Sequence, residues 1–155
     1  MEMHLLISGL FAVTVVMAFL EDYLKELHKI VILAVLATLM IVLATTKSID
    51  HTADGTIYEH IFYNNDEILT QLTTEPTFLW LSRLVLALGG GLIWMFLIYA
   101  LIAIPTKMKV LYGMTPYIFT ALIIYIPIYF ELHDMIQIRA AAACAFLLAA
   151  LQPLA

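Results

Sequence analysis

Cysteine is almost missing from this chain of 155 residues, in which Cys144 is the only one. A single cysteine excludes a framework of internal disulfides. Charge is scarce as well, since only 12% of the residues are charged, about half the share of a soluble domain. The net charge of −5 also disfavours nucleic acid as a partner. Because Cys144 lies in an alanine- and leucine-rich run, we expect it to be a small buried side chain.

Hydrophobic residues are in excess and make up 64% of the chain. They fall into uncharged runs whose lengths approach the ~20 residues that a helix needs to cross a bilayer. These runs predict an all-α integral membrane protein with about five transmembrane helices. The predicted spans are residues 3–20, 30–46, 84–106, 110–130 and 140–155.

The two ends of the chain bear on its domain organisation. The first apolar run follows Met1-Glu2-Met3-His4, which lacks the basic start of a cleaved signal peptide, so a retained helix is favoured. The last run offers only about 16 residues and no flanking charge. We therefore expect residues 1–155 to be a single membrane domain that forms the N-terminal half of a longer polytopic protein.

The distribution of lysine and arginine predicts the orientation in the membrane. The connections 21–29 and 106–113 each hold two lysines, and basic connections stay on the cytoplasmic side. The connection 46–76 holds one lysine and six acidic residues. This alternation places the N-terminus, the connection 46–76 and the connection 131–139 outside. In the same scheme Lys107 is a cytoplasmic anchor without a catalytic role.

Glycine and proline interrupt two of the spans. Gly89-Gly90-Gly91 is a poor helix interior, because each glycine costs about 1 kcal/mol relative to alanine. Residues 76–88 are therefore either a separate interfacial or re-entrant helix before a spanning piece at 92–104, or the start of one long tilted helix. Pro127 is expected to kink or end the fourth span. Irregular backbone at membrane depth lines cavities, so we predict an outer cavity near residues 131–134.

The long outer connection is predicted to carry two short amphipathic helices at the membrane surface, with a capped, partly ordered loop as the alternative. Ile57, Ile61, Ile68 and Leu72 fall at helical spacing, and Asn64-Asn65-Asp66 separates the two pieces.

Two arginines near the predicted outer ends of spans are candidate phosphate ligands. A charge at membrane depth is costly and faces a cavity or a partner, and the planar guanidinium matches a phosphate. Arg139 and Arg83 either bracket a diphosphate together or form ion pairs with carboxylates. The available carboxylates are those of Glu75, Glu131 and Asp134. A further alternative for Arg139 is an interfacial anchor that reaches the lipid headgroups.

Metal and cofactor patterns are weak in this sequence. The histidines lie at span ends or in loops, without the tight spacing of a zinc site or the placement of a haem ligand within a span. We therefore expect no metal and no cofactor. His133 beside Asp134 is a candidate general base, because imidazole titrates near neutrality.

Short motifs in a fixed order resemble the EpsG/Wzy-type polysaccharide polymerases of bacteria. Gly55-Thr56-Ile57-Tyr58 stands where that family commonly has Gly-Thr-Asp-Tyr, and Glu75-Pro76 opens the third helix. Ile138-Arg139-Ala140-Ala141 then leads into a small-residue helix, as in the family. The chain departs from the pattern at Ile57, where an acid is common. It departs again before the outer loop, where the family often has an arginine and this chain has Lys47 and His51.

The resemblance implies a metal-independent glycosyltransferase, multi-pass in the bacterial inner membrane. Such polymerases transfer a growing glycan from undecaprenyl diphosphate to a fresh lipid-linked repeat unit at the outer face, and the product is an O-antigen, a capsule or an exopolysaccharide. The implied partners are the lipid-linked glycan, the bilayer, and a chain-length regulator or flippase. The site residues predicted for substrate binding are Arg139, Arg83 and Tyr58, and those for catalysis are His133, Asp134 and Glu75.

Two non-enzymatic interpretations stay open. A transporter or flippase piece for lipid-linked sugars would use the same arginines, and charges in the middle of spans would favour it. The predicted charges lie near span ends, which favours an enzyme at the interface. An assembly subunit would use Arg139 only as an anchor and the alanine-rich last span for close helix packing.

Overall fold

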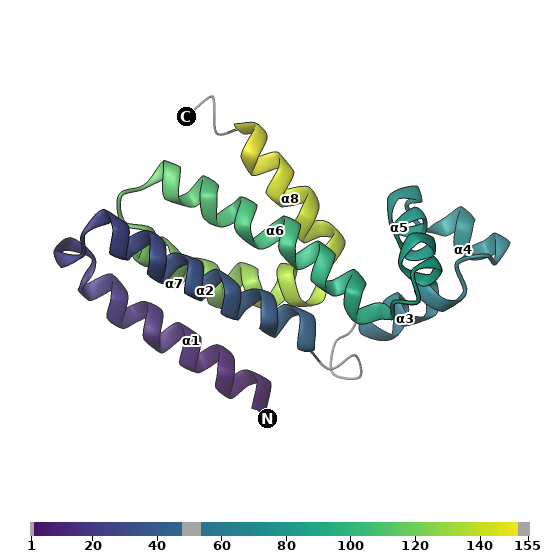
Figure 1. Cartoon of the computed structure of the whole chain (residues 1–155), viewed down its shortest axis with the longest axis horizontal. Coiled ribbons are helices and arrows are strands. Elements are labelled where there is room, and N and C mark those ends of the chain that lie inside the picture. Colours follow the sequence, from purple (N-terminus) through teal and green to yellow (C-terminus); the bar gives the residue numbers. More distant parts are fainter. Residues whose placement is uncertain (1, 48–53, 152–155) are drawn as a thin grey trace.

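The structure is a computed structural model that describes residues 2–47 and 54–151, and these residues form helices with no strand among them (Figure 1). The all-α class is thus confirmed for these ranges, while His51 lies outside them. The elements are α1 (Glu2–Phe19), η1 (Glu21–Tyr23), α2 (Glu26–Thr46), α3 (Gly55–Tyr63), α4 (Ile68–Thr73), α5 (Pro76–Ala87), α6 (Leu92–Met114), α7 (Ile118–Tyr125), the π-helix η3 (Ile126–Ile136) and α8 (Ile138–Leu151).

Three helices among the described residues are long and apolar enough to cross a membrane. They are α2, α6 and the continuous helix that α7 and η3 form together. The helix α6 has 23 residues, which at 1.5 Å each extend about 34 Å, more than the hydrocarbon core of a bilayer. The helices α1 and α8 are apolar but shorter. The membrane class is confirmed, and five spans stay a prediction.

The buried apolar side chains form two main cores, a larger one between the long helices and a smaller one beside the short helices. The first lies between α1, α2, α6 and the α7–η3 helix, where Met40, Ile104 and Phe130 are fully buried. Figure 1 shows α3, α4 and α5 gathered beside the start of α6. Side chains of α3 and α5 form the second core with the beginnings of α6 and α8. Where α6 meets α8 the contact residues are small, namely Ala103, Ala141 and Ala145.

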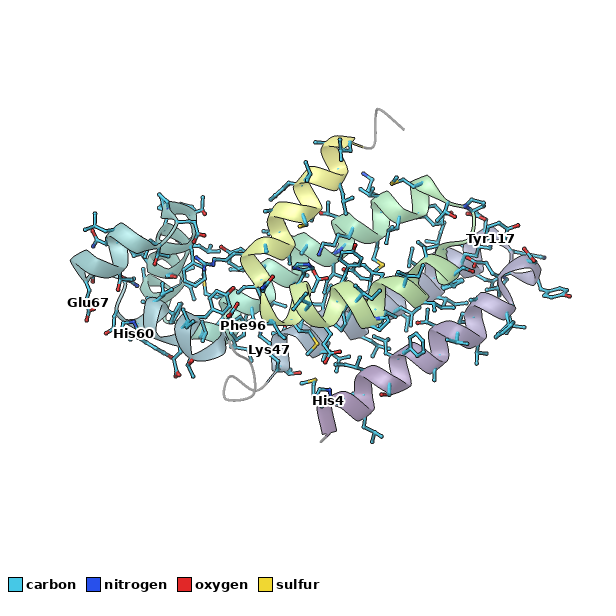
Figure 2. The ribbon with its side chains drawn as sticks, turned by 180° about the vertical axis from the view of Figure 1, so that it is seen from behind. His4, Lys47, His60, Glu67, Phe96 and Tyr117 are labelled. Atoms are coloured by element: carbon cyan, nitrogen blue, oxygen red, sulfur yellow. The ribbon has the colours of Figure 1, made fainter. Side chains whose placement is uncertain are left out.

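The ends of the helices alternate as the charge pattern predicts. Lys29, after η1, donates a hydrogen bond to the Pro116 carbonyl at 3.4 Å, so the first connection and the α6–α7 turn share one end of the bundle. His4 lies 3.5 Å from Glu131 at the other end. Figure 2 shows His4 and Tyr117 at these opposite ends. Which end faces the cytoplasm stays a prediction.

The buried carboxylate of Glu21 caps the start of α7 from a distant part of the chain. One of its oxygens accepts the Phe119 N–H at 2.9 Å, and the other accepts the N–H and the hydroxyl of Thr120, each at 3.2 Å. These N–H groups belong to the first turn of α7 and have no partner inside the helix, and a negative charge there also favours the helix dipole. The α1–α2 hairpin is thereby fixed to α7.

Two predicted connections are wrong. The third predicted span ends before Lys107, but α6 continues through Pro105 to Met114, and the turn follows at residues 115–117. The predicted connection 131–139 lies mostly within η3, and only Gln137 separates η3 from α8. Pro127 does not end the fourth span. The helix continues past it by widening from α to π geometry, which accommodates the missing backbone hydrogen bond.

The glycine triplet separates two helices, as the first alternative for this region predicts. Gly89 has a φ of 74° and ends α5, and its N–H bonds the Leu86 carbonyl while that of Gly90 bonds the Val85 carbonyl, both at 2.9 Å. This is the Schellman ending of a helix, which satisfies the last carbonyls. The new helix α6 starts after Gly91.

Replacing Gly89 with alanine is expected to lower the free energy of unfolding by about 1–2 kcal/mol, because an L-residue is strained at this φ. Thermal unfolding of the detergent-solubilised protein measures the change. Gly9→Ala is the matched control: Gly9 lies inside α1 and an added Cβ has no atom within 4 Å, so no loss is expected, because alanine is the better helix former. Equal losses in both variants would contradict this account.

The connection 46–76 forms the two predicted short helices, α3 and α4. The buried positions of α3 differ from the expected ones, because Tyr58 and Phe62 face the second core while Ile57 is exposed. Aromatic residues four apart, rather than the isoleucines, therefore fix α3 to the rest of the protein.

Candidate functional site

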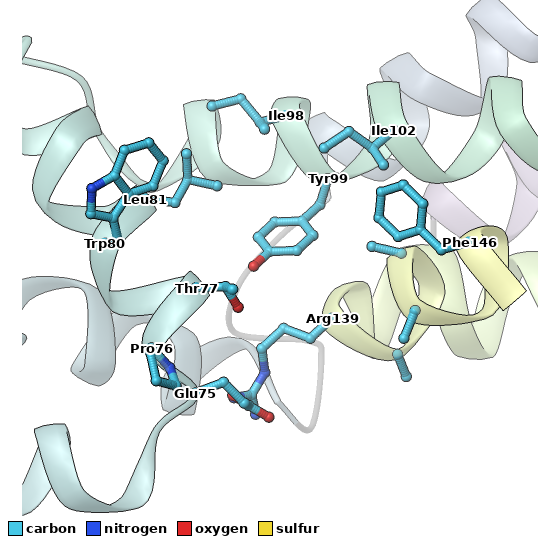
Figure 3. A pocket seen from close by; sticks show the side chains of 13 residues that line it. Glu75, Pro76, Thr77, Trp80, Leu81, Ile98, Tyr99, Ile102, Arg139 and Phe146 are labelled. Atoms are coloured by element: carbon cyan, nitrogen blue, oxygen red, sulfur yellow. The ribbon is translucent and has the colours of Figure 1, made fainter.

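A groove with a volume of about 810 Å³ lies between α5, α6 and α8 (Figure 3). Its polar lining comes from the beginnings of α5 and α8 and from the middle of α6, and its apolar lining continues along α6 and α8. The lining residues are Glu75, Pro76, Thr77, Trp80, Leu81, Ile98, Tyr99, Ile102, Arg139, Ala140, Ala142, Ala143 and Phe146.

Arg139 and Glu75 form an ion pair at the polar end of this groove. Glu75 is the residue just before α5, where Pro76 is favoured in the first turn, and Arg139 is in the first turn of α8. The pair therefore joins two helix N-termini that are 64 residues apart in the chain. Both side chains stay accessible, with 31% of Arg139 and 59% of Glu75 exposed. An exposed pair of this kind contributes little to stability and is free to exchange partners.

The Arg139 guanidinium packs against two aromatic rings. Its central carbon lies 5.4 Å from the ring centre of Tyr58 and 5.7 Å from that of Phe78, within the range of cation–π attraction. Phe78 in turn stacks on Tyr99 at 6.1 Å. Burial raises the pKa of the Tyr58 hydroxyl, and the adjacent Arg139 opposes that rise. Tyr58 is therefore a neutral support for Arg139 near neutral pH.

The groove changes from polar to apolar along its length. Figure 3 shows the Tyr99 hydroxyl pointing towards Thr77, on the same side as Arg139 and Glu75. Away from them, Ile102 and Phe146 form walls around the alanines of α8. Small side chains on α8 leave the space open. The groove fits a ligand with an anionic head and a long apolar body.

Lys47 approaches the same aromatic cluster from the end of α2. Its ammonium lies 4.3 Å from the ring centre of Phe96 and donates a hydrogen bond to the Met135 carbonyl (Figure 2). Burial lowers the pKa of this ammonium from 10.5 to about 8, and Asp54 opposes the shift.

The lowered pKa of Lys47 predicts that stability rises with pH from about pH 8 to 10.5. In this window the unfolded chain, with its ordinary pKa of 10.5, binds more protons than the folded one; below about pH 8 both are protonated and the contribution is constant. Thermal unfolding between about pH 7 and 10 measures it. Lys47→Met should flatten the rise, whereas exposed Lys25→Met should keep it. Equal slopes in the two variants would contradict the assignment.

Arg83 lies elsewhere. Its guanidinium donates to the Asn65 carbonyl at 3.3 Å and lies 3.5 Å from the Asp66 carboxylate, which fixes α5 to the turn between α3 and α4. The lining of the groove, as far as the chain is described, does not include Arg83. Arg83 therefore pairs with a carboxylate, but with that of Asp66, which was not among the predicted partners.

Asp134 is buried in a contact with α6, not in the groove. Its carboxylate accepts a hydrogen bond from the Lys107 ammonium at 2.7 Å and one from the Tyr125 hydroxyl at 2.5 Å. Lys107 is therefore not a cytoplasmic anchor, because it points into the helix bundle with 3% of its side chain exposed. The side chain of Lys107 extends from α6 to η3, where the Asp134 carboxylate faces the helix bundle.

His133 lines a second, apolar cavity of about 430 Å³ between α6, α7–η3 and α8. Its ring stacks on Tyr129, and its Nδ1 atom is buried with no hydrogen-bond partner in the described part of the chain. Cys144 lines the same cavity and is exposed, so the prediction of a buried cysteine is wrong.

Of the six predicted site residues, the structure brings Glu75, Arg139 and Tyr58 together. Arg83 lies apart from these three, and His133 and Asp134 lie at a third place. Sequence reasoning missed Lys107. No local signal marked it, because Lys107 directly follows the uncharged run 84–106, stands close to Lys109 and so looks like a basic anchor at the end of a span.

Fold and groove define a helical membrane protein with an arginine at the polar end of a largely apolar groove. In a comparison with protein families, residues 4–155 match the EpsG family. The chain belongs to the EpsG family, the family of Wzy-type polymerases. No curated protein and no solved structure matches it.

Proposed function

We propose that this protein polymerises oligosaccharide repeat units linked to undecaprenyl diphosphate, at the outer face of the bacterial inner membrane and with its N-terminus outside. Family membership supports a role in polysaccharide polymerisation in general. The observation that carries the specific proposal is the groove in which the accessible Arg139–Glu75 pair opens onto an apolar channel between α6 and α8.

The substrate is oriented by this polarity. Its diphosphate binds the Arg139 guanidinium, whose coplanar N–H groups donate hydrogen bonds to phosphate oxygens. Its isoprenoid chain follows Ile102, Ala143 and Phe146 towards the membrane interior. The exposed ring of Trp80 borders the polar end, where the sugars lie. Binding of the diphosphate replaces Glu75 as the partner of Arg139.

That exchange frees the Glu75 carboxylate for chemistry. The acceptor hydroxyl attacks the anomeric carbon of the growing chain, and its proton passes to Glu75 as general base. The new glycosidic C–O bond forms as the bond from that carbon to the diphosphate breaks, and the diphosphate leaves with the bonding electrons. Arg139 stabilises the negative charge that develops on it. His133 and Asp134, which lie off the groove, have no role in this step.

Filling the groove tests this placement of the substrate. Ala143→Leu is expected to raise the KM for a lipid-diphosphate-linked repeat unit about tenfold with little change in kcat, because it removes space for the apolar chain. Polymer formation by the purified protein in lipid nanodiscs measures both constants. Ala150→Leu, an equally exposed alanine of α8 outside the groove, is the matched control and should behave like the wild type. Equal effects at the two positions would contradict the proposal.

A second candidate is a carrier or flippase component for lipid-linked glycans. The Lys107–Asp134 pair favours it, because charges inside the helix bundle mark transport paths as well as structural contacts. The two functions differ in their product. A polymerase makes a ladder of longer glycans in detergent, where there are no two sides of a membrane, and a carrier leaves the repeat units unchanged.

A further inference from the structure

We propose that Lys107, Asp134 and Tyr125 act together as a lock that positions Arg139: by fixing Asp134 they hold η3 in its π-helical register, and this register sets where α8 begins. The inference deepens the proposed function, because the groove depends on Arg139. The residues of the lock are positioning residues, since none of them lines the groove.

The lock is built inside the bundle. The Asp134 carboxylate uses both oxygens, one on Lys107 at 2.7 Å and one on Tyr125 at 2.5 Å. The side chains of the ion pair are 3% and 0% exposed, so solvent does not compete for these contacts. Lys107 also lies 5.8 Å from the centre of the Tyr125 ring. The three side chains thus fix η3 to α6 at one defined rotation.

The π-helix makes this rotation matter for Arg139. A π-helix is rare and has more residues in each turn than an α-helix, so a change from one to the other rotates every later side chain about the axis. The widened geometry persists to the end of η3, where the Gln137 N–H bonds the Leu132 carbonyl five residues back at 3.0 Å. Arg139 follows Asp134 by five residues, and only Gln137, with its non-helical backbone (φ −98°, ψ 62°), separates η3 from α8, so a rotation of η3 shifts the start of α8.

A second contact holds the same segment from the other side. Lys47 donates to the carbonyl of Met135, the residue next to Asp134. Ile138, directly before Arg139, is buried in the aromatic cluster of the second core. The segment between the lock and Arg139 is therefore fixed from α2, from α6 and from the second core. Because replacing a buried ion pair by apolar residues is often neutral or stabilising, definition of the register accounts for its presence better than stability does.

Accessibility of position 139 tests the lock without any need for enzymatic activity. Cys144 is the only cysteine, so R139C in a C144A background carries one thiol for maleimide labelling in membranes. Adding Asp134→Asn or Lys107→Met is expected to change the labelling rate at position 139 about fivefold and to leave that of A150C unchanged. Glu21→Gln, which weakens a buried contact far from η3, should alter neither rate.

Two results of the labelling experiment would contradict the lock. An unchanged rate at position 139 overturns the lock, and so does an equal change at positions 139 and 150, which would mean general loosening. If Asp134→Asn does not accumulate in the membrane, Tyr125→Phe decides, because it keeps the ion pair and removes one hydrogen bond. It should change the rate at 139 in the same direction by a smaller factor, and no change overturns the proposal.

Polymerisation provides the link to the proposed function. If the lock acts through Arg139, Asp134→Asn should lower polymer formation per molecule about tenfold in the wild type and much less in an R139K background. Lys107→Arg, which keeps the charge, should retain more activity than Lys107→Met. If the activity losses of Asp134→Asn and R139K simply multiply in the double variant, the two residues act independently and the lock is overturned. If the wild type makes no polymer, but labelling of R139C still changes with Asp134→Asn, only the proposed function is overturned.

Discussion

Replacing Arg139 with alanine is expected to lower polymer formation about 100-fold or more, because it removes the charge that stabilises the leaving diphosphate. In cells the long surface glycan should shrink to single repeat units. The loss should not come from unfolding. Arg139 and Glu75 are accessible, and an exposed pair contributes only about 0–1 kcal/mol to stability. The glycan ladder, normalised to protein in the membrane, measures the effect.

Arg83→Ala is the matched control for this experiment. It removes the same side chain from α5, where the guanidinium binds Asn65 and Asp66 outside the groove. Its ladder should stay close to that of the wild type. Arg139→Lys should lie between, since a lysine keeps the charge but loses the planar fork. A normal ladder from Arg139→Ala, or equal losses from Arg83→Ala, would contradict the assignment of the diphosphate to Arg139.

Lys107→Met is expected to lower the free energy of unfolding by about 3–5 kcal/mol, because it leaves the Asp134 carboxylate buried without its cation. The remaining hydrogen bond from Tyr125 cannot balance a full charge. Chemical unfolding of the protein in detergent measures the change. The exposed neighbour Lys109 supplies the control, since Lys109→Met should stay within about 0.5 kcal/mol of the wild type.

The double variant K107M/D134N separates a missing partner from lost packing. It removes both charges and keeps a polar group for Tyr125, so most of the stability should return. A double variant as unstable as Lys107→Met alone would show that the aliphatic part of Lys107, and not its charge, holds α6 to η3.

The sequence predicted the membrane class and the helical content well, because these depend on local composition, whereas the ends of the third and fourth spans were wrong. Apolar runs locate α2 and most of α6, and the glycine triplet marks the break before α6. The motif order brought Glu75, Tyr58 and Arg139 into view together, and the structure gathers them at one groove. These features are visible within short windows of the chain.

The rest depends on contacts between distant residues. Lys107 looks like a basic anchor in sequence, and only the packing of α6 on η3 shows that it has a buried partner 27 residues away. Asp134 and His133 look like a catalytic pair because they are adjacent, yet adjacent residues of a helix point in different directions. A π-helix after Pro127 was not predictable, since no local pattern specifies it.

We expect the groove between α5, α6 and α8 to bind a lipid diphosphate through Arg139. Photo-crosslinking tests it most directly, with a photoreactive amino acid at position 143 in the groove or at position 150 outside it, and a radiolabelled polyprenyl-diphosphate-linked oligosaccharide. The account predicts strong labelling from position 143, weak labelling from position 150, and loss of the strong signal in Arg139→Ala. Equal labelling from both positions, or labelling at 143 that survives Arg139→Ala, would contradict it.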